Sequence, residues 1–475
     1  MRVLLINPQF EFKKFGSFTR FMEPMPSIGL AYIASVLVKN GIEIEIIDDF
    51  VLRLGAKGIL SVIKKKKFDI VGISCLTPSA PITFSIAAAI KSYDSKILIV
   101  LGNIHAVVFA GDILKKEAVD VIVHGEGEYT MLELAKAVAS GADLAQVKGI
   151  SFKQDGKIVH TPPRELIENL DELPYPQWQL FPFTKYAFLP FMDVKKPGLS
   201  ILGSRGCPYR CRFCSLPNTG TKYRERDPKK IADEIEYVIH NFPVKQISFV
   251  DPIFPLSKKV GLEFSEEMVR RKLHNKIVWT CETRIDRMDR ELLKAMRQAG
   301  CRRIMYGLES GVQALLDNIG KGFSVDYVKR IIKLTQQEDI SVAGVFMIGL
   351  PGETRAMTQQ TIDFAKQIDL DFAKFAITVP FPGSQLYEDL TRTGELKRQD
   401  WENFTTFNTN PKELVYVPGN MKPEELIEMQ RKGHRDFYLR PEIIFRQLFK
   451  IRTISIKDLF SGFFSLFSHG LHKNN

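Results

Sequence analysis

Cysteine is scarce in this chain, with six residues among 475, too few for a disulfide framework in so long a sequence. Long apolar runs are missing too, since no stretch approaches the roughly 20 apolar residues that a transmembrane helix needs. The apolar run beginning at Val3 is too short for a signal peptide and leads directly into a strand-like segment. Lysine and arginine form no stripe interleaved with aromatics, as nucleic-acid binding would favour. These absences predict a cytoplasmic protein without a nucleic-acid partner.

What remains is the composition of a folded globular protein. Hydrophobic residues make up 45% of the chain and charged residues 25%, which is typical of a packed core with a solvated surface. A length of 475 residues is long for one core and predicts two or three domains. The net charge of +11 is spread along the chain. It favours anionic substrates or a membrane surface, although solubility alone explains it about as well.

Residues up to 140 alternate between strand and helix patterns. Strand patterns occur at 3–6, 42–47, 70–74, 97–101 and 119–123, and helical periodicity at 28–39, 83–93 and 130–140. Repeated β–α units of this kind predict a doubly wound parallel sheet. Ligands of such sheets bind beyond the carboxyl ends of the strands. We therefore expect four polar loops to converge on one site: residues 7–8, 74–78, 102–105 and 124–128.

A second β/α series follows a proline-rich stretch. Six prolines interrupt residues 149–196, which predict a short strand pair at 150–159 and otherwise a linker packed against both neighbours. Strand patterns recur at 199–202, 246–250, 278–280, 303–306, 342–348 and 372–378. Six such units predict a (β/α)6 partial barrel with its chemistry at the carboxyl ends of the strands. The expected domains are an α/β domain at 1–145, a linker at 146–195, the barrel at 196–400 and a helical extension at 401–475.

The tail is helical from about residue 421, and from Pro441 it is both basic and aromatic. Such a mixture is typical of an amphipathic segment that lies on a membrane surface. We favour the simpler interpretation, in which a helix docks on the barrel and its end frays. Membrane-surface contact through the tail is the alternative, and it would make the protein peripheral to the membrane.

Three cysteines stand close together, on the loop after the first strand of the second series: Cys207, Cys211 and Cys214. Thiolates bind soft metals, and a cubane iron–sulfur cluster normally takes four of them. This C-x3-C-x2-C run supplies three, and no fourth Cys or His follows nearby. A structural zinc site would need a complete tetrahedral set. Three ligands leave one iron open to bind and activate a cofactor or substrate, so the motif predicts a [4Fe–4S] cluster.

At these residues the chain resembles the radical S-adenosylmethionine (SAM) superfamily, over nearly its whole length. The resemblance implies that the open iron chelates the amino and carboxylate groups of SAM. An electron from the cluster, supplied by an external donor such as flavodoxin or ferredoxin, then cleaves SAM to a 5′-deoxyadenosyl radical. Phe213 matches the aromatic residue that members place near the adenine. Further implied SAM contacts lie at later strand ends: Asp251, Arg284, Glu309, Ser310 and Gly349. No catalytic residue is assigned.

The amino-terminal series resembles the cobalamin-binding domain that precedes many radical SAM barrels. The resemblance implies a set of cobalamin contacts: Ser74, Leu76, Thr77, Gly102, His105, Gly125 and Glu126. The chain departs from the best-known cobalamin signature, because no Asp-x-His-x-x-Gly follows its first strand. The usual histidine ligand below the cobalt is therefore absent, and the subgroup implies cobalamin bound without it. His105 either lines that lower face or is a structural residue.

Together these features predict an α/β enzyme that uses a [4Fe–4S] cluster, SAM and cobalamin to modify an unactivated carbon of a small-molecule or lipid-like substrate. Methyl transfer, as in hopanoid methylases, is the favoured reaction. One alternative is an oxidative cyclase like the anaerobic magnesium-protoporphyrin monomethyl ester cyclase. Another is a non-catalytic sensor of cobalamin or redox state, which would have no need of SAM-type loops around Glu309 and Gly349. Methylthiotransferases are set aside, because their amino-terminal domain carries three more cluster cysteines and this one holds only Cys75.

Overall fold

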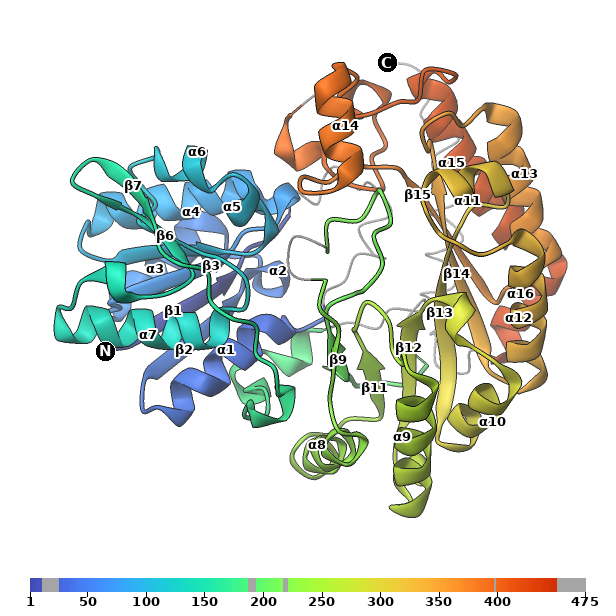
Figure 1. Ribbon diagram of the computed structural model, residues 1–475, viewed down its shortest axis with the longest axis horizontal. Helices are drawn as coiled ribbons and strands as arrows, with labels where there is room; N and C mark the ends of the chain where they lie inside the picture. Colours follow the sequence, from blue (N-terminus) through green and yellow to red (C-terminus); the bar gives the residue numbers. More distant parts are fainter. Residues whose placement is uncertain (11–24, 187–193, 217–220, 397–398, 451–475) are drawn as a thin grey trace.

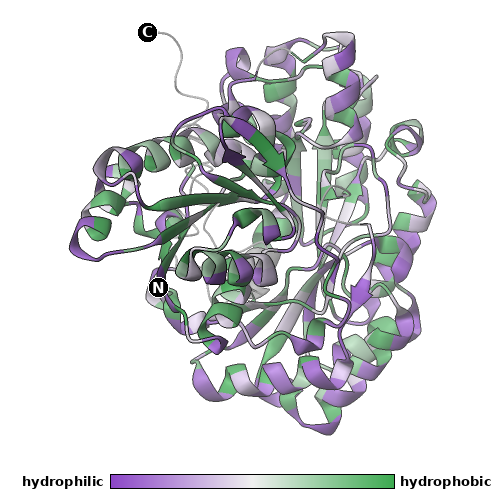
Figure 2. Ribbon diagram, turned by 60° about the vertical axis from the view of Figure 1, so that its left-hand side comes forward, coloured by the Kyte–Doolittle hydropathy of each residue, from purple (hydrophilic) through white to green (hydrophobic). Residues whose placement is uncertain are grey.

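The computed structural model describes residues 1–10, 25–186, 194–216, 221–396 and 399–450. Two α/β lobes lie side by side, each built on a largely parallel sheet (Figure 1). Figure 2 shows that the strands are the most hydrophobic elements and that the outer helices carry polar residues on one side. Each lobe therefore buries its sheet beneath amphipathic helices.

The amino-terminal lobe is a seven-stranded sheet with the order β2-β1-β3-β4-β5-β6-β7. Its strands are β1 (Arg2–Asn7), β2 (Glu43–Asp48), β3 (Ile70–Ser74), β4 (Leu98–Gly102), β5 (Val121–Val123), β6 (Ile150–Gln154) and β7 (Lys157–His160). Strands β1 to β5 run parallel, whereas β6 and β7 are antiparallel additions. The strand pair expected within the linker thus extends this sheet, because β6 pairs with the short edge strand β5.

Helices cover both faces of this sheet. They are α1 (Ile28–Lys39), α2 (Asp49–Leu52), α3 (Gly55–Lys65), α4 (Ala80–Tyr93), α5 (Ile104–Val108), α6 (Ala110–Leu114) and α7 (Gly127–Ser140). Alternate residues of β1 divide between the two faces: Val3 and Leu5 pack with α1 and α7, and Leu4 and Ile6 pack with α3 and α4. This period of two is what a strand buried on both sides requires.

The carboxyl-terminal lobe is a six-stranded parallel sheet with the order β15-β14-β13-β12-β11-β8. Its strands are β8 (Gly198–Ile201), β11 (Gln246–Phe249), β12 (Val278–Thr283), β13 (Cys301–Glu309), β14 (Ser341–Ile348) and β15 (Phe372–Ile377). Its helices are α8 (Pro228–Asn241), α9 (Lys258–Arg270), α10 (Arg290–Gln298), α11 (Gln313–Asn318), α12 (Val325–Gln337), α13 (Arg355–Gln367) and α14 (Gln385–Thr393). A small ribbon of β9 (Ser204–Arg205) and β10 (Arg224–Glu225) follows β8.

The six described strands do not close into a full barrel, and helix α15 (Pro423–Tyr438) covers the sheet edge at β15. Gln430 Nε2 donates to the Phe375 carbonyl (2.9 Å), and the Phe375 N–H donates to His434 Nε2 (3.3 Å). Tyr438 likewise donates through its hydroxyl to the Ala373 carbonyl (2.9 Å). Burial lowers the pKa of His434 to about 4, which keeps the ring neutral and able to accept. The helix therefore bonds the strand edge through side chains.

The linker packs against both lobes. Its Gln177 N–H donates to the Ala31 carbonyl of α1 (3.1 Å). The Tyr175 ring packs against that of Tyr237 on α8 (centroids 5.0 Å apart), and the Phe183 ring stacks on that of Phe242, the residue after α8 (5.3 Å). Apolar residues of the linker therefore belong to the same core as the first sheet and α8. This agrees with the expected packing on both neighbours.

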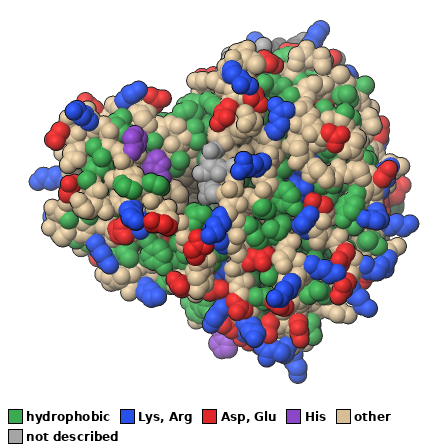
Figure 3. All heavy atoms as spheres, viewed as in Figure 1, with side chains coloured by type: hydrophobic (Ala, Val, Ile, Leu, Met, Phe, Trp, Pro, Cys, Tyr) green, Lys and Arg blue, Asp and Glu red, His purple; other side chains and the backbone are tan. Residues whose placement is uncertain are grey.

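Charged residues of both signs are mixed on the surface. Figure 3 shows Lys and Arg interspersed with Asp and Glu over the face in view. Within the described part of the chain, no helix is long and apolar enough to cross a membrane. Helix α16 (Pro441–Lys450) begins the basic, aromatic tail, but residues 451–475, on which the membrane-surface alternative depends, lie outside the described residues.

Candidate cluster and cofactor site

The three-cysteine loop follows β9 and lies between the two lobes (Figure 1). Cys207, Cys211 and Cys214 are half-buried and form no disulfide. Burial raises the pKa of Cys207 and of Cys214, negative charge on neighbouring cysteines raises it further, and the Lys321 cation lowers it. The three sulfur atoms are thus close enough to interact electrostatically, with a cation beside them.

Arg212, inside the motif, anchors this loop to the barrel. Its guanidinium donates to Asn318 Oδ1 (2.7 Å) and to the Asp389 carboxylate (2.9 Å). Its backbone N–H donates to the Ile319 carbonyl (3.2 Å), and its carbonyl accepts from the Leu386 N–H (2.8 Å). Helices α11 and α14 therefore fix the loop from both sides.

Arg284 follows β12 and lies against the same loop. Its guanidinium bonds both Asp286 oxygens (3.0 and 3.1 Å) and lies 3.7 Å from the centroid of the Tyr209 ring. Its Nη1 is 3.8 Å from Cys211 Sγ. A cation in this position stabilises thiolate charge. The structure thus places Arg284 on the cysteine loop, and its contact with SAM stays a prediction.

Glu309 ends β13 with a φ of +60°, in the left-handed region that residues other than glycine seldom adopt. Its carboxylate accepts a hydrogen bond from Lys321 Nζ at 2.9 Å, and both side chains are buried. Lys321 Nζ in turn lies 5.8 Å from the centroid of the Phe213 ring. A Cβ at Gly307 would come within 2.6 Å of Glu309 Oε1, so this pair needs a glycine beneath it. Local backbone strain held by a buried ion pair is typical of functional sites.

The other three residues predicted for SAM have their polar atoms tied into the protein. Asp251 is buried, where it accepts from the Gly203 N–H (3.0 Å) and the Ser204 hydroxyl (2.5 Å), and burial raises its pKa to about 7. Ser310 shares a hydrogen bond with a threonine of α13 (3.1 Å). Gly349 donates its N–H to the carboxylate that precedes α13 (2.8 Å). Their part in SAM binding stays a prediction.

The residues predicted for cobalamin lie at the carboxyl ends of β3, β4 and β5, and they are Ser74, Leu76, Thr77, Gly102, His105, Gly125 and Glu126. Thr77 Oγ1 and His105 Nδ1 are buried without a hydrogen-bond partner among the described residues. A Cβ added at Gly102 or Gly125 would meet no atom within 4 Å. The orphaned Thr77 hydroxyl and the open backbone at the two glycines fit a ligand rich in hydrogen-bonding groups, such as cobalamin.

His105 is enclosed by aromatic rings. It is 1% exposed, and its ring centroid lies 4.8 Å from that of Phe109 and 4.9 Å from that of Trp401. Burial lowers its pKa to about 4, so the imidazole is neutral at pH 7. Because Trp401 lies in the segment that follows α14, that segment closes over the amino-terminal lobe here. The packing favours the structural role for His105, and a place on the lower face of cobalamin stays a prediction.

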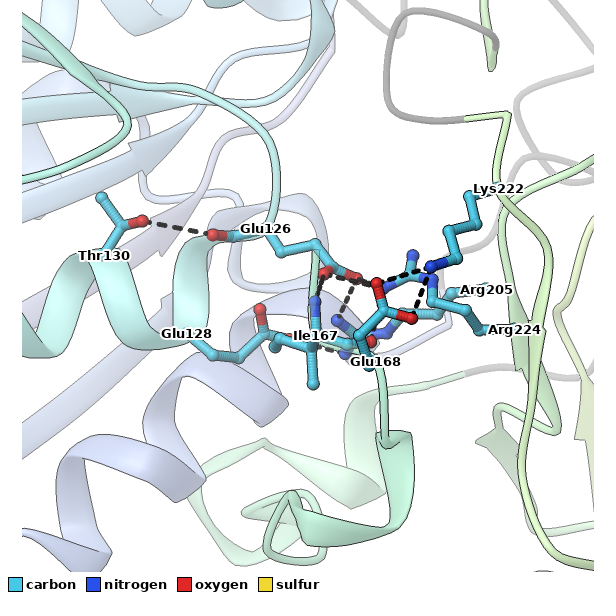
Figure 4. Close-up of polar contacts among 8 residues, drawn as sticks. All are labelled: Glu126, Glu128, Thr130, Ile167, Glu168, Arg205, Lys222 and Arg224. Atoms are coloured by element: carbon cyan, nitrogen blue, oxygen red, sulfur yellow. Dashed lines mark hydrogen bonds and ion pairs between the residues drawn. The ribbon is translucent and has the colours of Figure 1, made fainter. Parts of the chain in front are cut away.

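Glu126 and Glu128, at the start of α7, form ion pairs with the barrel (Figure 4). Arg205 bonds Glu126 (2.9 Å) and Glu128 (2.6 Å), and Arg224 bonds both oxygens of Glu126 (2.9 and 3.0 Å). Burial alone would raise the pKa of Glu126, but hydrogen bonds from Arg224 and the Ile167 N–H, with the Arg205 charge, hold it below its usual value. The network joins the β5 loop to the ribbon that leads into the cysteine motif.

The donor set fits an iron–sulfur cluster. In the described part of the chain, no three His, Cys, Asp or Glu side chains surround a single metal ion. A cubane cluster makes a different demand, because each thiolate binds its own iron atom. Three mutually interacting thiols beside Lys321 and Arg284 supply soft ligands and positive charge for an anionic cluster.

Lys321→Met is expected to lower the free energy of unfolding by about 3–5 kcal/mol, because it leaves the buried Glu309 carboxylate without its counter-ion. Denaturant unfolding of the purified chain measures the change. The control is Lys329→Met, whose partner Asp326 is 91% exposed, and an effect below about 1 kcal/mol is expected there. Equal effects of the two changes would contradict the role given to the Glu309–Lys321 pair.

Known proteins resemble the chain at both lobes. Residues 19–135 match the B12 binding domain, and residues 201–365 match the radical SAM superfamily. An uncharacterised methyltransferase of Pyrococcus horikoshii is 32% identical over 97% of this chain and 98% of its own length. The anaerobic magnesium-protoporphyrin IX monomethyl ester cyclase of Rubrivivax gelatinosus is 32% identical over 92% of this chain and 78% of its own.

The chain belongs to the radical SAM family whose members carry a B12-binding domain. Its fold is also that of the radical SAM methyltransferase TsrM of Kitasatospora setae, solved with cobalamin and a [4Fe–4S] cluster, with a TM-score of 0.71 at 18% identity over 93% of this chain and 89% of that one. The predicted family, the fold class of doubly wound sheet plus partial barrel, and the prediction of a methyltransferase-like, cobalamin-dependent radical SAM enzyme are confirmed.

Sequence reasoning missed several charged residues of the site. Arg205 and Arg224, which bind the β5 loop, and Lys321, which binds Glu309, belong to none of the motifs used. Arg205 stands at the end of β9, two residues before Cys207, and this proximity to the cysteine motif was the one signal that could have found it. Lys321 lies between two glycines, where no periodicity marks it.

Proposed function

We propose that this enzyme transfers a methyl group to an unactivated carbon of a small-molecule or lipid-like substrate. In this proposal Cys207, Cys211 and Cys214 hold the cluster, the region of Phe213 and Glu309 holds SAM, and the carboxyl ends of β3 to β5 hold cobalamin. When bound, cluster and SAM supply a carbon-centred radical that can abstract hydrogen, and cobalamin supplies a methyl carrier. We also propose the domain boundaries predicted from the sequence, which fall after residues 145, 195 and 400.

One observation supports this arrangement of the cofactor sites more strongly than any other. Arg205 leads into the cysteine motif and bonds Glu126 and Glu128, which stand at the β5 loop of the other lobe. The loops proposed to hold the two cofactors are therefore joined across the lobe boundary by one ion-pair network, which Figure 4 shows. Lys321 and Arg284 then balance the charge of the thiolates, while Arg212 holds their loop against α11 and α14.

An oxidative cyclase is the second candidate. The observation that favours it is the 32% identity with the magnesium-protoporphyrin ester cyclase, which equals the identity with the archaeal methyltransferase. An external electron donor such as flavodoxin or ferredoxin and a cytoplasmic place are proposed in either case, with membrane-surface contact through the tail as the alternative to a tail docked on the barrel. These last proposals follow from the family resemblance and the composition of the tail.

Anaerobic purification with added cobalamin tests the proposal. Iron, corrinoid and 5′-deoxyadenosine are quantified in a dithionite-reduced sample with SAM, together with S-adenosylhomocysteine, the product that SAM leaves on donating a methyl group. Methyl transfer predicts both nucleoside products, and a cyclase predicts 5′-deoxyadenosine without S-adenosylhomocysteine. A protein that holds cluster and corrinoid but never cleaves SAM would behave as a sensor and contradict both proposals.

A further inference from the structure

The strand register shows which side chains face the barrel lumen. Glu282 on β12 pairs with Met305 on β13, and one row farther along Gly307, Val345 and Lys374 pair across β13, β14 and β15. Paired positions of neighbouring strands share a face of the sheet. The opposite face packs on helices α9 and α12. These five residues therefore point toward the lumen.

The lumen is filled at one end and accessible at the other. Toward the amino ends of the strands, Arg303 lies 4.2 Å from the centroid of the Phe372 ring, and both side chains are buried. Nearer the carboxyl ends, inward residues are partly exposed, although their neighbours along each strand are buried. The apolar ones are Met305, Val345 and Met347. This end also faces the cysteine loop, so it is where a substrate would meet the reacting groups.

Glu282 and Lys374 are ionisable side chains on this inner surface, separated by two strands. No described residue donates a hydrogen bond to the Glu282 carboxylate, whose electrostatic partner is Lys374. Lys374 Nζ lies 4.9 Å from the centroid of the Phe407 ring and forms no ion pair with a described carboxylate. Polar groups removed from bulk water are normally hydrogen-bonded. Among the described residues neither member of this pair makes a polar contact, so a ligand lying between the two strands would supply a partner to each.

The electrostatics agree with this geometry. Burial raises the pKa of Glu282 to about 7, against the effect of the Lys374 charge, and burial lowers the pKa of Lys374. Each group therefore holds its charge less readily than in water. A ligand that places a hydrogen-bond donor at Glu282 and an anion at Lys374 would restore both charges.

We propose that Glu282 and Lys374 recognise the substrate, with Lys374 binding an anionic group such as a carboxylate and Glu282 accepting a hydrogen bond from a donor on the same molecule. Met305, Val345 and Met347 then surround an apolar body, a task suited to flexible thioethers. The substrate class is an apolar molecule with an anionic group and a separate N–H or O–H donor. This inference rests on the proposed function for its location in the reaction site, but it concerns binding and needs no turnover.

Fluorescence titration of the reconstituted full-length protein tests the proposal. The probes are 8-anilinonaphthalene-1-sulfonate, an apolar anion with an N–H donor, and N-phenyl-1-naphthylamine, which has the same rings and N–H but no sulfonate. Lys374→Met is expected to weaken the sulfonate probe about 10-fold and the neutral probe less than about 2-fold, because one charge-assisted hydrogen bond is lost. Glu282→Leu is expected to weaken both probes about 5-fold, since both carry the N–H.

Matched controls are Lys329→Met on α12 and Glu424→Leu on α15, both at the surface. If Lys374→Met binds the sulfonate probe as Lys329→Met does, the proposal is overturned. SAM that displaces the probe from the unaltered protein would assign the pair to SAM and overturn it as well. If circular dichroism shows that Lys374→Met does not fold, Lys374→Gln carries the same expectation. Failure of the proposed function would be seen in a different measurement. The unaltered protein would then not cleave SAM, regardless of how tightly the two probes bind.

Discussion

Replacing Cys211 by alanine is expected to abolish both cluster iron and SAM cleavage. The motif supplies three thiolates in all, so two would remain, too few to hold a cluster with a single open iron. Arg284, whose Nη1 is 3.8 Å from Cys211 Sγ, would then face a cavity instead of a thiolate. Iron quantification and a 5′-deoxyadenosine assay on anaerobically reconstituted protein measure both effects.

Cys301→Ala is the matched control, because Cys301 is buried at the start of β13 and belongs to no motif. It is expected to keep its iron and its SAM cleavage, with a loss of stability of about 1 kcal/mol from the small cavity. Full iron content and cleavage in Cys211→Ala would remove the assignment of the cluster to this loop.

Glu126→Ala is expected to lower the free energy of unfolding by about 3–5 kcal/mol, because it leaves Arg205 and Arg224 without their shared carboxylate in a largely buried interface. Since the carboxylate also fixes one lobe to the other, the linker should become more sensitive to proteolysis. Denaturant unfolding and limited proteolysis measure the two effects. The change Glu133→Ala, also on α7, removes an ion pair whose glutamate is 46% exposed and should cost below about 1 kcal/mol.

The same carboxylate gives the interface a pH dependence. The pKa of Glu126 is lower in the folded protein than its ordinary value of 4.5. Its stabilising contribution is therefore fully present above about pH 4.5 and is lost as the pH falls through the folded pKa. Unfolding curves of Glu126→Ala and of the unaltered protein should converge toward acid pH. A difference that stays constant below pH 4 would show that Glu126 acts through packing and not through its charge.

Much of the fold could be predicted from the sequence because single segments carry its signals. Helical periodicity and the Asn-Gly stop placed α1 (Ile28–Lys39) with its observed bounds, and the apolar run at 70–74 gave β3. The hairpin at residues 150–160 was predicted as strands but not as part of the first sheet, since pairing partners depend on distant chain. The prediction for 303–306 found the middle of β13 but not its continuation to Glu309, where the backbone turns left-handed.

The candidate site, like the fold, could be predicted only in part. Cysteines spaced three and two residues apart, and a loop rich in glycine, can be recognised in the sequence alone. Glu126 lies 79 residues from Arg205 and 98 from Arg224, and Glu309 lies 12 residues from Lys321. No local sequence pattern predicts these pairings. Glu282 and Lys374 did leave a signal, because each is a lone charge within an apolar strand. That signal becomes meaningful only when the register shows that both face the lumen.

The side-chain bonds from α15 to β15 bear on how the chain can be shortened. An uncovered edge strand offers its N–H and C=O groups to any other strand, and chains then pair edge to edge. Gln430, His434 and Tyr438 occupy those groups at Phe375 and Ala373. A version ending before Pro423 would keep every cysteine yet expose this edge. Expression in insoluble form is the outcome to expect from it, so a purification tag belongs beyond α16.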